Sequence, residues 1–493
     1  MHSSDQRAVA LSGSDIPGAH ELLVHSCEDC ACPPSGGSAV RTAAEPPGGP
    51  LVRAREIVEC PVDDEHTALF NPDGNGGVLI VNRRGRALLD LFATPLEIDR
   101  IAAAGFGDES AAAAVRHLFG HDLLHPAGAP PDPRFAESRQ LTAWLHVTNK
   151  CNLKCPYCYV SKSDDAMSRD TGRDSVDALV RSAVRNGFSA LRLKYAGGEA
   201  SLNADVLLDL HQYAQEQCDA AGLTLSAVLL SNGVAIGRRL AAALTEHGIG
   251  VMISLDGIGE AHDAQRPTVG GRGSSHLVLR TVGRLLEAGV RPHISITITS
   301  RNVDAVGPVV RFALERDLTF SFNFFRDNDC SAAVADLQYE EKAMLEGLEA
   351  AFAEIEENLP RWSVLGCVLD RGQLLAPRRR ACGVGDDYVV IDQRGGIAKC
   401  HMEIGDTLGD VRTVDPVLAV RDDSRGIRNL LVEDKQGCRD CTWRHWCSGG
   451  CAAATFRATG RFDVRSPNCA IYRTIYPQAV RLEGLRLLRY AVT

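Results

Sequence analysis

The chain has 493 residues, of which 45% are hydrophobic and 24% charged, and its net charge is −10. This composition is typical of a globular protein, and the length corresponds to about three domains. The negative charge, the lack of a membrane-length apolar stretch and the lack of an export signal exclude a basic nucleic-acid binder or a membrane protein, so we expect a cytoplasmic location. The 17 cysteines then indicate metal ligands or catalytic groups rather than disulfides.

Residues 1–50 are rich in proline and glycine and show no apolar periodicity, which predicts a flexible tail. The tail contains Cys27, Cys30 and Cys32. We interpret these as incidental thiols. The alternatives are an extra metal clip and an appended peptide segment that is itself a substrate.

Residues 51–128 predict a small compact domain. Two strand-like runs, 66–71 and 77–82, flank the turn sequence PDGNG, and three short helical stretches follow. Strands followed by three helices indicate a winged-helix-like unit. Nothing in the domain, taken alone, is catalytic.

The next region, residues 141–335, alternates between strands and helices. Six such repeats predict an α/β fold with a parallel barrel or open sheet, in which functional residues lie where strands end. The expected strands are 141–147, 190–196, 223–230, 250–255, 292–298 and 319–325, and the expected helices are 175–187, 203–222, 237–248, 274–289 and 304–317.

The pattern changes again near the C-terminus. Residues 336–366 contain one acidic linking helix, and residues 476–493 predict a C-terminal helix. Between them, residues 367–475 are loop-rich and full of cysteine. Such a segment buries little core per residue, so it needs cross-links or metal.

The first strand of the repeat runs directly into TNKCNLKCPYCYV, where Cys151, Cys155 and Cys158 form the spacing C-x3-C-x2-C. Three thiolates on one loop can ligate three irons of a 4Fe–4S cluster and leave the fourth iron open for another ligand. A zinc ribbon is the alternative, but it would need a fourth ligand nearby, and none follows closely.

This motif and its place after the first of six repeats resemble the radical S-adenosylmethionine (SAM) superfamily. The resemblance implies a partial (β/α)6 barrel of the TIM type. It also implies that Cys151, Cys155 and Cys158 hold a catalytic cluster whose open iron chelates SAM. In similar enzymes, an electron from the cluster releases a 5′-deoxyadenosyl radical, which abstracts a hydrogen atom from the substrate.

Further segments match the SAM-contact motifs of the same superfamily in order. A GGE motif follows the second strand, two polar residues follow the third, and SLDGIGEAHDAQRP follows the fourth. The polar residues after the third strand, Ser231 and Asn232, could also be plain turn residues. The segment DGIGEA mimics a dinucleotide-binding glycine motif but lacks the complete spacing of that motif. By resemblance, the expected SAM contacts are Tyr157, Gly197, Gly198, Glu199, Ser231, Asn232, Ser254 and Arg266.

The C-terminal cysteines have the pattern C-x12-G-x4-C, then C-x2-C-x5-C-x3-C, then a final cysteine. This resembles the SPASM extension of peptide-modifying radical SAM enzymes, which carries two auxiliary 4Fe–4S clusters, so the expected total is three clusters. Zinc knuckles are the alternative. The resemblance assigns Cys382, Cys400, Cys451 and a candidate eighth ligand, Cys367, to the nearer cluster, and Cys438, Cys441, Cys447 and Cys469 to the outer one.

The domain at 51–128 resembles the leader-recognition element of ribosomal-peptide maturases, which is related to the small chaperone of pyrroloquinoline quinone synthesis. Such a domain binds the leader of a precursor peptide as an added strand. A generic winged-helix module is the alternative. Together the resemblances imply a maturase that forms an intramolecular carbon–carbon, thioether or ether cross-link in a precursor peptide, with flavodoxin or ferredoxin as reductant.

Three other functions remain open. A sulfatase (formylglycine) maturase is disfavoured because His401 stands where similar enzymes carry an aspartate after the cysteine. A peptide epimerase would need a thiol hydrogen donor, for which Cys330 is a candidate. A non-catalytic iron–sulfur carrier or scaffold would not need the residues expected to contact SAM.

Overall fold

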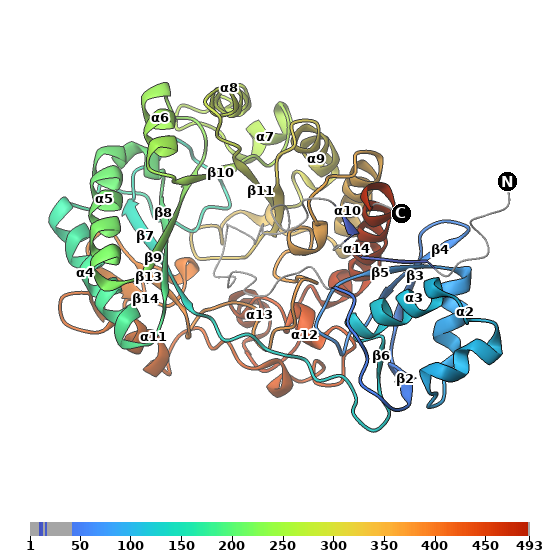
Figure 1. The fold of residues 1–493 in the computed structure, drawn as a ribbon. Coiled ribbons are helices and arrows are strands. Elements are labelled where there is room, and N and C mark those ends of the chain that lie inside the picture. The colour runs from blue at the N-terminus through green and yellow to red at the C-terminus, as the bar shows by residue number, and fades with distance from the viewer. Residues whose placement is uncertain (1–8, 13–14, 17–41, 492–493) are drawn as a thin grey trace.

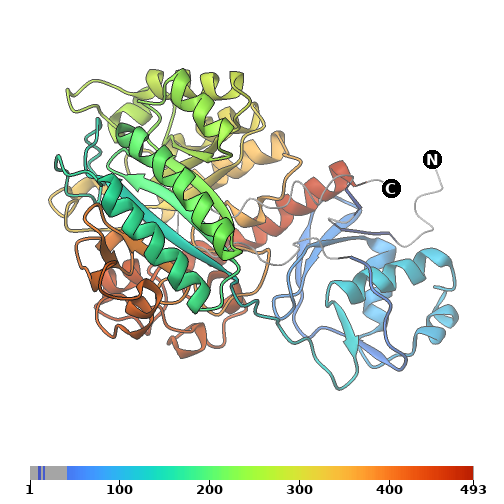
Figure 2. The same cartoon turned by 60° about the vertical axis from the view of Figure 1, so that its left-hand side comes forward.

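The computed structural model describes residues 9–12, 15–16 and 42–491. The cysteines at positions 27, 30 and 32 therefore lie outside the described residues. A small N-terminal domain stands beside a larger α/β unit, and a loop-rich C-terminal region lies under the α/β unit (Figures 1 and 2). Among the described helices, none is both long and apolar enough to cross a membrane.

The N-terminal domain contains the hairpin expected at the PDGNG turn. Its four-stranded sheet has the order β1-β5-β4-β3, and every neighbouring pair is antiparallel. The helices cover one face of this sheet (Figure 1). Its elements are β1 (Ala10–Leu11), β2 (Leu51–Arg53), β3 (Val58–Pro61), β4 (His66–Phe70), β5 (Leu79–Asn82), α2 (Arg83–Leu91), η3 (Ile98–Ala104), α3 (Glu109–Gly120) and β6 (Leu124–Pro126).

Strand β1 corrects one expectation. It lies inside the segment 1–50 that the sequence indicates to be a flexible tail, yet Ala10 and Leu11 pair with β5. The pairing forms because apolar side chains of β1 find partners on both faces of the sheet: Leu11 packs in the core on one face and Ala10 against the core on the other.

The α/β unit is built on six parallel strands, β7 to β12, in sequential order, which confirms the predicted fold class. The strands are almost entirely buried because helices cover the outer face, as expected of a parallel sheet. The strands are β7 (Gln140–Thr148), β8 (Ala190–Gly197), β9 (Thr224–Ser231), β10 (Gly250–Ser254), β11 (His293–Ile298) and β12 (Phe320–Phe324). The helices are α4 (Arg169–Arg185), η4 (Ala200–Asn203), α5 (Ala204–Ala221), α6 (Arg238–Glu246), α7 (Glu260–Gln265), α8 (Ser275–Glu287), η5 (Val303–Ala305) and α9 (Val306–Leu314).

The sheet does not close on itself as a complete barrel. Strand β7 instead pairs in parallel with β13 of the C-terminal region, and β14 and β15 continue the sheet. The C-terminal region is thus an extension of the barrel sheet. The elements that follow β12 are η6 (Ala335–Leu337), α10 (Glu341–Glu357), η7 (Val364–Gly366), β13 (Tyr388–Ile391), β14 (Gly396–Ala398), η8 (His401–Glu403), β15 (Gly409–Asp410), α11 (Pro416–Asp422), η9 (Val432–Asp434), α12 (Arg444–Cys447) and α13 (Ala452–Thr459).

The last helix, α14 (Cys469–Tyr490), begins at a cysteine, seven residues before the expected start at 476. It packs against α10 and against β3, β4 and β5 of the N-terminal domain. The close approach depends on Gly484, where a Cβ atom would lie 2.9 Å from side-chain atoms of Ala68 and Ile80. Helix α14 therefore covers the sheet face that the N-terminal helices leave open.

Candidate functional site

One cavity of about 220 Å³ lies at the carboxyl ends of the barrel strands. It lies where parallel α/β folds place their functional residues. The expected cysteine loop and every expected SAM contact line it: Cys151, Cys155, Tyr157, Cys158, Gly197, Gly198, Glu199, Ser231, Asn232, Ser254 and Arg266.

The three cysteines sit on the loop that follows β7. The Cys151 sulfur accepts a hydrogen bond from the Leu153 amide at 3.4 Å and faces the Asn232 side-chain nitrogen at 3.8 Å. Burial raises the pKa of the Cys155 thiol to about 12. None of the described cysteines forms a disulfide. Three thiols at one cavity wall suit a 4Fe–4S cluster, which binds each thiolate through a different iron.

No three His, Cys, Asp or Glu side chains in the described part of the chain are grouped so as to hold a single metal ion. A cubane cluster does not require such convergence, because its irons stand at separate corners. The donor set around the cavity therefore fits the group that the sequence predicts.

Gly197 ends strand β8 and Gly198 follows it, and both lie against the cysteine loop. A Cβ atom on Gly197 would lie 2.5 Å from the Thr148 carbonyl oxygen, and one on Gly198 would lie 2.5 Å from the Lys150 carbonyl oxygen. Both atoms belong to backbone, which cannot move aside like a flexible side chain. The two glycines thus let the loop that begins at Cys151 lie directly on the end of β8.

Glu199 is buried and is held by the ends of two strands. Its Oε1 accepts hydrogen bonds from the Ser201 amide and hydroxyl and from the Ser231 hydroxyl, at 3.1, 2.5 and 2.8 Å. Its Oε2 accepts from the Asn232 amide at 2.7 Å. A carboxylate offers about four acceptor positions, so Oε2 keeps one for a ligand. Ser231 and Asn232 are therefore more than turn residues, because they position this carboxylate.

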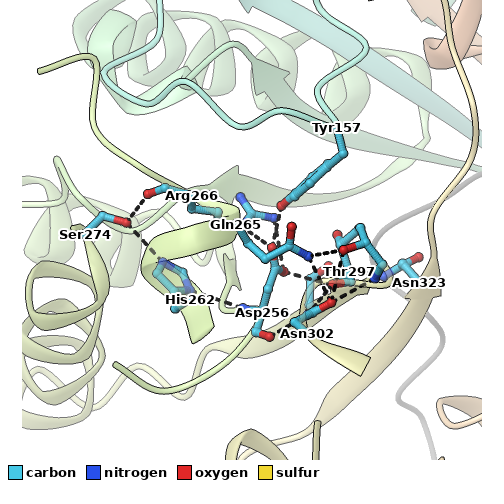
Figure 3. Close-up of polar contacts among 11 residues, drawn as sticks. Tyr157, Asp256, His262, Gln265, Arg266, Ser274, Thr297, Asn302 and Asn323 are labelled. Carbon is cyan, nitrogen blue, oxygen red and sulfur yellow. Dashed lines mark hydrogen bonds and ion pairs between the residues drawn. The ribbon is translucent and has the colours of Figure 1, made fainter. Parts of the chain in front are cut away.

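The Arg266 guanidinium lies against a carboxylate that the sequence analysis missed. Asp256, fully buried, accepts from Arg266 Nε at 2.7 Å, from the Tyr157 hydroxyl at 2.5 Å and from the Thr297 amide at 2.9 Å (Figure 3). The Arg266 guanidinium also lies 5.4 Å from the Tyr157 ring centre. Burial, followed by the charge of Asp256, raises the pKa of Tyr157 well above its usual value. Asp256 thus orients two of the expected SAM contacts.

A further set of polar residues lines the cavity without having been expected from the sequence. Ser295, Thr297 and Asn323 lie on or just after the last two barrel strands, and the Asn323 side-chain nitrogen donates to the Ser295 hydroxyl at 3.2 Å. The signal available was their position at strand ends. Other unexpected lining residues are Trp144, Met252, Arg326, Arg371, His401 and Met402.

His401 closes the cavity on the side of the C-terminal region. Its ring stacks on Trp144, with centres 4.6 Å apart, and its Nδ1 lies 3.1 Å from the Tyr388 hydroxyl. Burial, followed by the positive charge of Arg371, lowers the pKa of His401 well below its usual value. The imidazole is therefore neutral at physiological pH.

Three cysteines of the C-terminal region gather near Arg326 and Arg371, two of the arginines that line the cavity. Cys382, Cys400 and Cys451 pack together at one core cluster. Burial raises the pKa of Cys382 and Cys400, and Cys451 raises both further. At Cys451 itself burial acts in the same direction, but Arg326 and Arg371 outweigh it and bring the pKa below the usual value.

The other four cysteines form a second group. Burial, followed by the charges of Cys438, Cys441 and Cys469, raises the pKa of Cys447 to about 12. Cys469 begins helix α14, and Cys447 ends helix α12. The assignment of these seven cysteines to two clusters stays a prediction.

Cys367, the candidate eighth ligand, is buried in the apolar core. Its thiol donates to the Val364 carbonyl oxygen at 3.4 Å. Its role as a ligand stays a prediction.

Cys330 lies on a second cavity, which shares Tyr159, Val160 and Met402 with the first. Its exposed thiol donates to the Tyr159 carbonyl oxygen at 3.4 Å. Burial, followed by the charge of Cys158, raises its pKa, so the group stays a thiol at neutral pH.

Comparisons with known proteins identify the domain. Residues 145–308 match the model of the radical SAM superfamily. Fe-coproporphyrin III synthase of Methanosarcina barkeri is 29% identical over 185 residues, which cover 37% of this chain and 43% of that protein. The chain thus spans less than half of that relative's length.

Two other relatives match a larger share of the chain. The cysteine-type anaerobic sulfatase-maturating enzyme of Clostridium perfringens is 25% identical over 62% of this chain and 86% of its own length. PqqA peptide cyclase of Bradyrhizobium diazoefficiens is 23% identical over 69% of this chain and 90% of its own length.

The fold also resembles a solved structure of anSMEcpe with bound AdoMet and a peptide. The TM-score is 0.56 at 19% identity, and the match covers 71% of this chain and 99% of the other. Radical SAM domains imply SAM and one 4Fe–4S cluster. With their cysteine loop at the mouth of a six-stranded partial barrel, residues 145–308 form a domain of the radical SAM type.

Proposed function

We propose that the protein is a radical SAM maturase that modifies a ribosomally made precursor peptide by forming an intramolecular cross-link. The observation that carries this proposal is the common cavity of the cysteine loop and all the expected SAM contacts. The names of the relatives support a peptide or protein substrate, since they include a peptide cyclase and a sulfatase-maturating enzyme.

In this proposal Cys151, Cys155 and Cys158 hold the cluster, and Glu199 Oε2 accepts from the SAM ammonium. Bound SAM supplies a 5′-deoxyadenosyl radical that removes a hydrogen atom from the peptide. Arg266 and Tyr157, fixed by Asp256, orient the SAM carboxylate or ribose and the adenine. The protein thus contributes orientation and the exclusion of water.

We assign two auxiliary 4Fe–4S clusters to the two groups of C-terminal cysteines, which brings the total to three. The nearer group is Cys382, Cys400 and Cys451, with Cys367 as the candidate fourth ligand. Arg326 and Arg371 line the SAM cavity and also face Cys451, so this group is close to the reacting centre. It is therefore the better placed of the two to accept the electron that remains after bond formation. Flavodoxin or ferredoxin would supply the electron that starts the reaction, in the cytoplasm.

The domain at 51–128 is assigned to the leader of the precursor. Its sheet has two edges, at β1 and at β3. Strand β3 ends in Pro61, which has no amide hydrogen to donate. On the other side of the sheet, β5 pairs with the two-residue strand β1. Because β5 can thus pair with an added antiparallel strand, this edge supports a role of the domain in leader recognition.

Peptide epimerisation is the second candidate, and the position of Cys330 favours it. This thiol is protonated at neutral pH and lies beside the carbonyl of Tyr159, the residue after Cys158. Replacement of Cys330 by alanine separates the two reactions. With this replacement a cross-linking enzyme still forms its product, whereas an epimerase loses the hydrogen donor that completes each turnover.

The decisive experiment is anaerobic incubation of the reconstituted protein with SAM and dithionite. We expect 5′-deoxyadenosine, and about 12 iron per chain for three clusters. Addition of a candidate precursor, read from a short open reading frame beside the gene, should yield a peptide lighter by two hydrogens. An iron-loaded protein that forms no 5′-deoxyadenosine would instead be an electron carrier or scaffold.

A further inference from the structure

The edge of β5 is occupied by the chain's own N-terminal segment. Ala10 pairs with Val81 and Leu11 with Ile80 in antiparallel register. The Asn82 amide donates to the Val9 carbonyl oxygen at 3.4 Å, and the Val9 amide donates to the Asn82 side chain at 3.1 Å. This is the same kind of backbone pairing that an added peptide strand would make.

Side chains of the segment fill both faces of the sheet. Leu11 and Ile16 are 8% and 3% exposed and belong to the core that includes Ile80. Ala10 points to the opposite face and packs against the core that includes Val81. The alternation matches the period of two in a strand, so the segment has a definite register on β5.

Asn82 of β5 and Gly85 of α2 are placed to accept the backbone of this segment. The Asn82 side chain accepts from the Gly85 amide at 2.8 Å as the cap of helix α2, and the same oxygen accepts from Val9. A Cβ atom on Gly85 would lie only 2.8 Å from the Val9 carbonyl oxygen. Gly85 therefore leaves space for a strand at this edge, and Asn82 accepts a hydrogen bond from its backbone. Both contacts are to the backbone of the strand rather than to its side chains.

The segment turns away directly after the pairing. The Asp15 carboxylate accepts from the Ser12 amide at 2.6 Å and from its hydroxyl at 3.0 Å, and the Asp15 amide donates to the Ser12 carbonyl oxygen. The paired region is therefore only two residues long. So short a strand is weakly held on its own, and its retention depends on being part of the same chain.

We propose that residues 9–12 are a built-in occupant of the strand-accepting edge of β5, which a precursor leader must displace in order to bind. The proposal rests on the proposed function for the identity of the competing strand. A tethered segment acts at an effective concentration on the order of mM, so it suppresses weak leaders and admits those that pair over a longer stretch. The edge thus selects leaders by length of pairing.

The test uses the full iron-loaded chain and a fluorescein-labelled synthetic peptide that copies residues 5–18, followed by anisotropy. Leu11→Asp places an unpaired carboxylate in the core and releases the built-in segment while leaving the edge intact. We expect Leu11→Asp to bind the peptide at least tenfold more tightly than the unaltered chain does.

Two further variants provide the matched comparison. Adding Gly85→Ala to Leu11→Asp should abolish the gain, because the new methyl group meets the backbone of the incoming strand. Adding Gly283→Ala instead should keep the gain, since a Cβ atom there has no other atom within 4 Å. Equal peptide binding by the unaltered chain and Leu11→Asp would overturn the proposal.

Hydrogen exchange gives a measurement that needs no peptide. The Asn82 amide should exchange at least tenfold faster in Leu11→Asp, while the amides of β4, which pair on both sides, stay unchanged. Unaltered exchange at Asn82 would also overturn the proposal. Once a precursor is known to be modified, it should displace the labelled peptide from Leu11→Asp. If it does not, competition with leaders is ruled out while the occupation by residues 9–12 stands. If no precursor is modified at all, only the proposed function fails.

Discussion

The loop at residues 151–158 and the cysteines at 382–469 contain the same side chain in two different settings. The loop draws three cysteines from eight consecutive residues and lines a polar cavity beside Glu199. The C-terminal cysteines come from separate segments and pack into the core of a region with little regular structure. The first setting leaves room for a ligand, whereas in the proposed function the second would hold the polypeptide together through its clusters. Loss of a cysteine should therefore cost chemistry in one region and fold in the other.

The largest effect on chemistry is expected for Cys155→Ala. We expect 5′-deoxyadenosine formation to fall to background and about four of about twelve irons to be lost. The thermal unfolding midpoint should hardly change, since the barrel strands supply the core around the loop. The measurements are product analysis, iron content and a melting curve of the same sample. A melting temperature lowered as far as in C-terminal variants would contradict the contrast between the regions.

The matched variant in the other region is Cys447→Ala. We expect the loss of about four irons together with a drop of more than about 5 °C in the melting temperature, because in the proposed function metal ligation stabilises this loop-rich region. Formation of 5′-deoxyadenosine should persist in the surviving folded protein, while cross-linked peptide disappears. If unfolding is unaffected, these cysteines are not what holds the C-terminal region together.

Asp256→Asn sharpens the comparison within the catalytic cavity. The change leaves the Arg266 guanidinium buried beside a neutral amide, which costs about 3–5 kcal/mol when a buried pair is broken. We expect SAM binding to weaken by about 10–100-fold, as when supporting residues of a metal site are altered. Equilibrium dialysis with labelled SAM measures this. Ser163→Ala, an exposed loop change, is the control and should leave SAM binding unaltered.

The smallest effect is expected at the joint between the N-terminal domain and the rest. Gly484→Val would press two methyl groups against Ala68 and Ile80, and overpacking of this kind costs about 1–3 kcal/mol. SAM cleavage should be retained, with the melting temperature lowered. Gly283→Ala serves as the control, since it has open space around it. Loss of SAM cleavage in Gly484→Val would mean that helix α14 also supports the catalytic cavity.

Much of the catalytic cavity was predictable because its residues come from short motifs that follow strands in chain order. The GGE motif, Ser231, Asn232 and Arg266 were expected in this way, and all of them line the cavity. Asp256 was missed although it lies two residues after Ser254, because its importance comes from the meeting of Tyr157 and Arg266 in space. No pattern along the sequence indicates that these side chains converge.

Two other features could not be read from the sequence for physical reasons. Strand β1 has too few residues for an alternating pattern to stand out in a segment rich in glycine and proline. Arg326 and Arg371 resemble any other arginine in the chain, and only the packing of the C-terminal region against the barrel brings them to the cavity. Both features depend on packing between residues that are far apart in the sequence, and local secondary-structure propensity does not predict such packing.

The position of helix α14 has a consequence for the order in which the protein is completed. The N-terminal sheet leaves the ribosome before helix α14, yet Ala68, Phe70 and Ile80 on one of its faces share a core with residues of α14. Phe70 also packs on Trp443 and Trp446, with ring centres 5.8 and 4.8 Å away. More than 350 residues must therefore be synthesised before this apolar face is covered. During that interval the apolar face stays exposed to solvent, and the core of the N-terminal domain becomes complete only once helix α14 has been synthesised.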